Sequence, residues 1–287
     1  MITFFQVLLF GTILGGVYAV MAYGLGLIYG VMRIVNLAHG AVLMLAAYAA
    51  FELHARWRID PLLGALLIVP AAYLGGALVY RHLVSRVATG PPMAAMLLLF
   101  GIGLCARNVA YLVWTGDDQT IALSHGLRTV DLGAPVPLTR LIVFGVAIAT
   151  TLALFVLFRF THFGRAVRAV ARDPIAAELS GLSVARVSAR AFGAGTALGA
   201  LGGVLLATLY VINPELGGPF LLKSFCIIVL GGMDSMPGIL AGALTLGVAE
   251  TAAGVYGGSS MQDLVSFVLL VAILVGRPGG LPSLVRR

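Results

Sequence analysis

The residues of this chain that could do chemistry are polar side chains set singly into apolar stretches. Asn36 and His39 lie between two such stretches, Arg107 and Asn108 lie within a third, and Glu250 lies well inside a later one. Polar groups within a membrane are costly unless they pair with one another or face a water-filled cavity. The chemistry they indicate is recognition of a polar solute on a path through a membrane.

No sequence pattern typical of an enzyme is present. The chain has no His-Glu-x-x-His zinc motif, no Gly-x-Ser-x-Gly nucleophile turn, and no pair among its 5 histidines at metal-ligand spacing. Lys223, the one lysine, stands in an apolar context and not in a Gly-x-x-x-x-Gly-Lys-Ser/Thr loop, so the chain is not expected to bind ATP itself. The sequence therefore predicts a chain that is not an enzyme and holds no cofactor or metal. Lys223 joins the residues above as a candidate pathway residue.

Each candidate pathway residue also has a plain structural explanation. Asn36 and His39 could serve only to satisfy backbone groups at a break between two helices. Arg107 is about 12 Å from the end of its stretch at 1.5 Å per residue, so it could reach the outer interface instead of meeting a solute carboxylate or an acid inside the membrane. An unpaired Glu250 is expected to stay protonated because burial disfavours its charge. On that expectation, Glu250→Gln should preserve most of the transport.

A loop over residues 161–187 carries a different signal, a short capped helix. Asp173 before Pro174 is a good N-cap followed by proline at the first helical position, and Gly181 is a suitable terminator. Residues 174–180 are therefore predicted to form a helix of about two turns.

This short helix is predicted to carry an apolar face. Ile175 and Leu179 are spaced i, i+4 and share that face, while Arg168 and Arg172 precede it. A capped helix held beside the membrane suits insertion into a cleft on a partner protein. The alternative is an ordinary basic loop in contact with anionic lipid, which explains the arginines but not the capped helix.

The composition is that of a membrane protein. Of 287 residues, 60% are hydrophobic and 10% are charged, against roughly 25% charged in a typical soluble domain; the mean hydropathy is +1.05. Nine apolar stretches are seen, near 4–31, 34–53, 61–80, 93–115, 139–160, 188–212, 219–233, 237–256 and 262–276. We expect an all-α, polytopic membrane protein with eight or nine spans, residues 1–287 forming one transmembrane domain. The net charge of +7 comes from bases between the stretches, so no nucleic-acid partner is expected.

The charges predict an orientation with the N-terminus outside. The cytoplasmic side then holds twelve bases: Arg33, Arg81, Arg86, Arg159, Arg165, Arg168, Arg172, Arg186, Arg190, Arg277, Arg286 and Arg287. Its three acids are Asp173, Glu178 and Asp234. The outer side holds five bases (Arg56, Arg58, Arg128, Arg140, Lys223) and seven acids (Glu52, Asp60, Asp117, Asp118, Asp131, Glu215, Asp263). This asymmetry obeys the positive-inside rule.

Glycine and proline punctuate the late part of the chain. Residues 213–219 and 231–238 are rich in both and flank a short apolar stretch, which indicates broken helices that line protein or a cavity. Most other glycines lie inside apolar stretches, where we expect them to let helices approach closely.

Six segments occur along the chain in the following order: Asn36-Leu37-Ala38-His39-Gly40, the Gly164–Gly181 loop, Lys223-Ser224-Phe225, Gly231–Gly238, Glu250 and Arg277-Pro278-x-Gly280. Together they closely resemble the permease subunits of high-affinity branched-chain amino acid ABC transporters. The resemblance spans nearly the whole chain and is to the shorter of the two permeases in such systems.

The resemblance implies a bacterial inner-membrane importer in which this chain forms the translocation pathway for branched-chain amino acids. Its implied partners are membrane lipid, a second related permease, two cytoplasmic ATPase subunits that use ATP-Mg, and an extracytoplasmic solute-binding protein. The loop around Asp173–Gly181 would be the ATPase-docking element.

Two residues depart from the family pattern. Asp234 stands where the family usually has glycine, and Arg107 stands where an uncharged polar residue is more usual. Either could mark another solute, since family members also import urea, short amides or aromatic acids. An ion-coupled secondary transporter or channel is a further alternative, which would need paired intramembrane acids, and Glu250 is the one acid clearly at depth.

Overall fold

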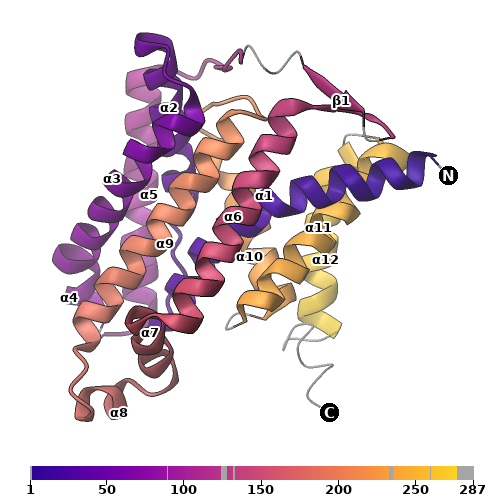
Figure 1. The fold of residues 1–287 in the computed structure, drawn as a ribbon. Coiled ribbons are helices and arrows are strands. Elements are labelled where there is room, and N and C mark those ends of the chain that lie inside the picture. Colours follow the sequence, from indigo (N-terminus) through magenta and orange to yellow (C-terminus); the bar gives the residue numbers. More distant parts are fainter. Residues whose placement is uncertain are drawn as a thin grey trace.

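The computed structural model describes residues 2–88, 90–123, 128–131, 133–232, 235–258 and 260–276, and it is mainly helical over them (Figure 1). The long helices are α1 (Ile2–Met32), α2 (His39–Trp57), α3 (Pro61–Val79), α5 (Pro92–Trp114), α6 (Leu138–Phe160), α9 (Val184–Ala207), α10 (Gly217–Gly231), α11 (Met236–Gly257) and α12 (Ser260–Gly276). The shorter helices are α4 (Ser85–Val87), α7 (His162–Arg172) and α8 (Pro174–Leu179), and a π-helical turn, η1 (Tyr80–Val84), follows α3. Strands β1 (Thr129–Asp131) and β2 (Pro135–Pro137) form an antiparallel hairpin with Val130 opposite Val136.

Every predicted apolar stretch contains one of the long helices, which confirms the all-α class. The largest boundary differences lie next to polar residues. Helix α1 ends at Met32 because Arg33 takes a φ of +56°, and α2 begins only at His39, since the Asn36 carboxamide oxygen accepts from the backbone N–H of Ala38 in the break. Helix α9 stops at Ala207, earlier than the predicted 212. Helix α7 and the hairpin were not predicted.

Some of the long helices have the length and hydropathy of membrane-spanning helices, and others do not. In the described part of the chain, six helices are long and apolar enough to span: Phe4–Met32, Pro61–Val87, Pro92–Trp114, Leu138–Phe160, Val184–Ala207 and Met236–Gly257. Helix α10 has 15 residues, about 23 Å at 1.5 Å per residue, against roughly 30 Å for the hydrocarbon core. It is therefore the short late segment expected from the glycine-rich breaks.

Helices α1 and α9 form the centre of the bundle. In the most apolar 18-residue window of α9, 78% of the residues are buried, against 17% in α3, 11% in α5 and 17% in α6. In Figure 1, α1 crosses between the α3–α5 side of the molecule and the α11–α12 side. The outer helices expose large apolar side chains such as Leu66, Leu97 and Leu152, as lipid-facing surfaces do.

Glycines set the close contacts at this centre, as the sequence predicts. A Cβ added at Gly24 of α1 would lie 2.5 Å from the carbonyl oxygen of Gly195 on α9. A Cβ at Gly247 of α11 would lie 2.5 Å from the carbonyl oxygen of Gly11 on α1. Only residues without side chains allow backbones to approach this closely, and van der Waals packing of this kind drives helix association in lipid.

The two ends of the bundle differ in charge and in local structure. Helices α7 and α8 lie at one end and the β1–β2 hairpin lies at the other (Figure 1). A cavity of about 950 Å³ at the α7 end is lined by Arg33, Arg168 and Arg172 among other residues. Bases that the sequence places on the cytoplasmic side thus meet in space at one end.

We expect this basic end to face the cytoplasm. Single cysteines at Ser180, beside α8, and at Thr129, in β1, test this in a background without Cys105 and Cys226. A membrane-impermeant maleimide added to intact cells should label the cysteine at position 129 and not the one at position 180, because the positive-inside rule places the arginine-rich end within. Labelling of position 180 alone would reverse the orientation.

Candidate functional site

A charged pair lies at the end of α5 that is predicted to face outward. The Arg107 Nη1 donates to Glu215 Oε2 at 3.2 Å, and the Tyr111 hydroxyl donates to Glu215 Oε1 at 2.9 Å. Arg107 and Tyr111 are one turn apart on α5, so both face the segment that precedes α10. The Arg107 and Glu215 side chains are 43% and 57% exposed. The acid that meets Arg107 therefore lies in the segment that precedes α10, at the surface of this chain.

An apolar cavity of about 300 Å³ adjoins this pair. Its walls come from the start of α2, the middle of α5 and the start of α10, and they include Met44, Phe100 and Leu221. Arg107 is the charged residue among the lining residues. The site thus combines two exposed opposite charges with an apolar recess of the size of a small ligand pocket.

Asn108, the neighbour of Arg107, lies outside this arrangement. Its side-chain amide donates to the backbone carbonyl of Leu104 at 2.8 Å on its own helix, and it is exposed. The structure therefore brings together Arg107 and two residues that were not predicted, Glu215 and Tyr111, but not Asn108.

Asn36 and His39 are buried and bind backbone groups at the break between α1 and α2. Asn36 Oδ1 accepts from the Ala38 N–H at 3.1 Å, and His39 Nε2 lies 3.1 Å from the Met21 carbonyl oxygen. The His39 ring also packs against Gly199, where an added Cβ would come within 2.7 Å of it. These contacts match the structural explanation of the pair; Asn36 also lines a lateral cavity between α2, α3, α5 and α9.

A buried polar cluster joins four helices in the second half of the bundle. Lys223 Nζ of α10 lies 3.1 Å from Glu250 Oε2 of α11, and the Tyr18 hydroxyl of α1 donates to the same oxygen at 2.6 Å. Ser266 of α12 donates to the other oxygen of Glu250. The Lys223 and Glu250 side chains are 10% and 2% exposed. This is a fully engaged carboxylate, with a cation and two hydroxyl groups around it.

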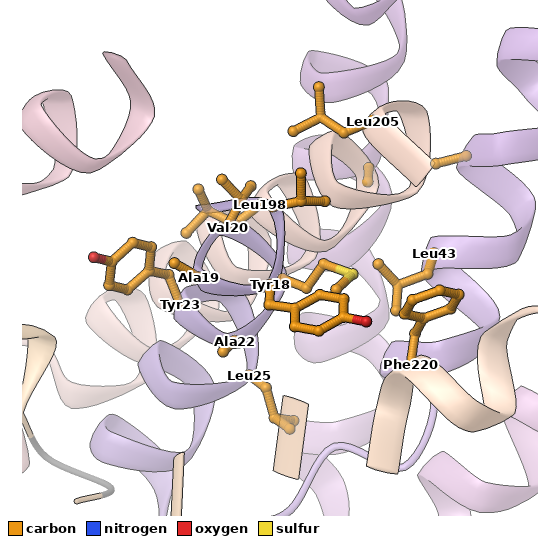
Figure 2. Packing of buried hydrophobic residues seen from close by; sticks show 14 of the residues in the cluster. Tyr18, Ala19, Val20, Ala22, Tyr23, Leu25, Leu43, Leu198, Leu205 and Phe220 are labelled. Atoms are coloured by element: carbon orange, nitrogen blue, oxygen red, sulfur yellow. The ribbon is translucent and has the colours of Figure 1, made fainter. Parts of the chain in front are cut away.

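The cluster sits beside the apolar core. Tyr18 lies among the packed side chains of α1 and faces Phe220 of α10 (Figure 2), with ring centroids 6.2 Å apart. Lys223 Nζ lies 5.5 Å from the centroids of both rings, where the aromatic faces attract its positive charge.

Lys223, which the sequence analysis grouped with the outer bases, is buried beside Glu250. Its ammonium group gains a carboxylate and two aromatic rings there. The expectation that Glu250 is unpaired is wrong, because Lys223 Nζ lies 3.1 Å from its carboxylate. An ion-coupled transporter with paired intramembrane acids is therefore not favoured, since in the described residues Glu250 pairs with a base.

The predicted docking helix is present as α8. Asp173 caps it by accepting from the backbone N–H groups of Ile175 and Ala176, both at 3.0 Å, and Gly181 follows with a φ of +84°. Ile175 and Leu179 are 74% and 85% exposed.

The arginines lie on α7, just before the docking helix. Arg168 donates to the backbone carbonyl of Phe158, and Arg168 and Arg172 both line the basic cavity described above. Asp234, the other departure from the family pattern, lies outside the described residues.

Some site residues had a usable sequence signal and others had none. Tyr111 stands four residues after Arg107, a spacing that places two helical side chains on one face. Glu215 is 108 positions from Arg107, and Tyr18 is 232 positions from Glu250, so neither pairing can be read from spacing.

Comparison with known proteins identifies the family. A family model described as branched-chain amino acid transport system / permease component matches residues 7–274. The LivH permease protein of the high-affinity branched-chain amino acid transport system of Salmonella typhimurium is 33% identical over 97% of this chain and 95% of its own length. The corresponding BraD protein of Pseudomonas aeruginosa is 30% identical over 97% of this chain and 95% of its own length.

A solved structure supports the fold. The structure of PsaBC from Streptococcus pneumoniae in complex with Fab matches with a TM-score of 0.51 at 14% identity, over 96% of this chain and 93% of that one. The fold, the spanning helices and the full-length relatives agree, and the chain therefore belongs to the permease component family of branched-chain amino acid transport systems as a multi-pass protein of the inner membrane.

Proposed function

We propose that this chain is the permease subunit of an ABC importer and forms part of the pathway along which branched-chain amino acids cross the membrane. Its partners are a second related permease, two cytoplasmic ATPase subunits that hydrolyse ATP-Mg, and an extracytoplasmic solute-binding protein. The two relatives are permease proteins of high-affinity branched-chain amino acid transport systems, which supports this solute class over urea, short amides or aromatic acids. The chain has no phosphate-binding loop, so ATP hydrolysis is assigned to separate subunits.

The observation that carries the proposal is the exposed helix α8. Ile175 and Leu179 are apolar, and their side chains are exposed on this capped helix at the basic end of the bundle. Nothing in the described residues covers them. A contact of this kind lets a partner move the bundle through α7, whose Val167 and Val170 are buried against it. We assign α8 and the 161–187 loop to docking on an ATPase subunit, with Arg168 and Arg172 at the margin of the contact.

Replacing Ile175 and Leu179 together with aspartate should prevent this docking. Burial of each side chain contributes about 1.5–3 kcal/mol, so the affinity of the ATPase should fall by more than about a hundredfold. Copurification of the ATPase with the permease, and ATP-driven uptake of leucine by proteoliposomes, should both be lost. The permease itself should insert normally because both residues are exposed.

The matched control is Ile175→Val with Leu179→Met, which keeps the apolar face and should retain uptake. Normal copurification and coupled uptake in the double aspartate variant would rule out α8 as the docking element. It would leave open the assignment of the solute, which wild-type uptake measures separately.

A further inference from the structure

We propose that Arg107, Glu215 and Tyr111, together with the apolar cavity beside them, form a binding site for a zwitterionic amino acid with an aliphatic side chain. This inference rests on the proposed function, because it assigns a position in this chain to the solute. The site is the recess between the starts of α2 and α10 and the middle of α5.

The charges match those of an α-amino acid in kind and in number. The solute carries one carboxylate and one ammonium group, and the site offers one guanidinium and one carboxylate in contact with each other. On binding, Arg107 turns its donors to the solute carboxylate and Glu215 accepts from the solute ammonium. One ion pair is exchanged for two, and the net charge of both site and solute stays zero, so no uncompensated charge is brought into the membrane.

Tyr111 fits a positioning role in this exchange. Its hydroxyl donates to the Glu215 oxygen that Arg107 does not contact. Glu215 therefore keeps a donor on one oxygen when Arg107 leaves the other, and its carboxylate stays beside Pro214, which lines the recess.

The cavity would hold the aliphatic side chain of the solute. Its volume of about 300 Å³ and its walls of leucine, methionine, phenylalanine and glycine suit an aliphatic group. Gly218 lines the cavity, and a Cβ added there would meet no atom within 4 Å, so the recess is open at that point.

The pair is accessible to a ligand, because its two side chains are 43% and 57% exposed in this chain. A second ion pair, Arg56 with Glu52 at 2.6 Å, lies within α2, and its arginine side chain, 74% exposed, provides a comparison.

The test is photolabelling of the assembled, nucleotide-free transporter with photo-leucine, a diazirine analogue of leucine. Adducts located by mass spectrometry should fall on cavity residues such as Phe100, Leu104 and Leu221. Leucine should compete with the label, and alanine should need a concentration at least about tenfold higher to do so. Isocaproate, which lacks the ammonium group, and isoamylamine, which lacks the carboxylate, should fail to compete.

Two variants should weaken the labelling and one should not. Arg107→Gln and Glu215→Gln each remove a charged hydrogen-bonding partner and should lower cavity labelling by about tenfold or more. Arg56→Gln, the matched control, should leave it unchanged.

Two results would overturn the proposal. One is adducts elsewhere in the chain with none in the cavity. The other is equal competition by isocaproate or isoamylamine. The wild-type adduct positions decide the matter even if a variant fails to assemble. Leucine uptake by the wild-type importer tests the proposed function separately, so a transporter that imports leucine but labels elsewhere would refute the site alone.

Discussion

Glu250→Gln is expected to cause severe loss of the assembled permease. The substitution removes a carboxylate charge that lies 3.1 Å from the ammonium group of Lys223, in a pair whose side chains are only 10% and 2% exposed. Removing one partner of a buried ion pair costs about 3–5 kcal/mol. The amount of folded protein in the membrane and the thermal unfolding of the purified permease should both fall sharply. This reverses the outcome expected for an unpaired carboxyl group.

A second substitution should rescue the first. Lys223→Met in the Glu250→Gln background also removes the buried positive charge while keeping an apolar side chain of similar length, and replacing both members of a buried pair is often nearly neutral. Arg56→Gln, which breaks the ion pair with Glu52 at a side chain that is 74% exposed, is the matched control and should cost at most about 1 kcal/mol. Wild-type stability of Glu250→Gln alone would mean that the carboxyl group is neutral and that Lys223 does not depend on it.

Gly217→Val is expected to separate α10 from α2. The backbones of Gly217 and Gly40 touch, and a Cβ at Gly217 would overlap the carbonyl oxygen of Gly40. The added side chain would meet backbone atoms, which cannot rotate away as a side chain can. The two helices must therefore move apart, which should lower the free energy of unfolding by about 1–3 kcal/mol or more. We expect a lower unfolding temperature and reduced leucine uptake, because the same contact holds the segment that carries Glu215.

The neighbouring residue is the control for this prediction. A Cβ at Gly218 would meet nothing within 4 Å, so Gly218→Ala should leave the unfolding temperature near that of the wild type. Equal unfolding temperatures of Gly217→Val and Gly218→Ala would contradict the prediction, because they would show that α2 and α10 can move apart without loss of stability.

Local sequence determined the elements of this protein. Apolar runs of membrane-spanning length specify helices because a backbone in lipid must satisfy its own hydrogen bonds. The cap of α8 was also readable, since the Asp173 carboxylate binds N–H groups only two and three residues away. The charge asymmetry of the loops predicted which end is basic, and Arg33, Arg168 and Arg172 do meet at one end.

Only the tertiary structure decided how the polar residues pair. Lys223 reads as an outer base along the chain, yet it lies between α1 and α11, because a buried cation is held where a carboxylate and aromatic rings converge from other helices. Arg107 and Glu215 likewise meet across 108 positions. Spacing along a helix fixes which residues share its face, but the partner opposite that face is chosen by helix packing, which here depends on close glycine contacts such as Gly40 with Gly217.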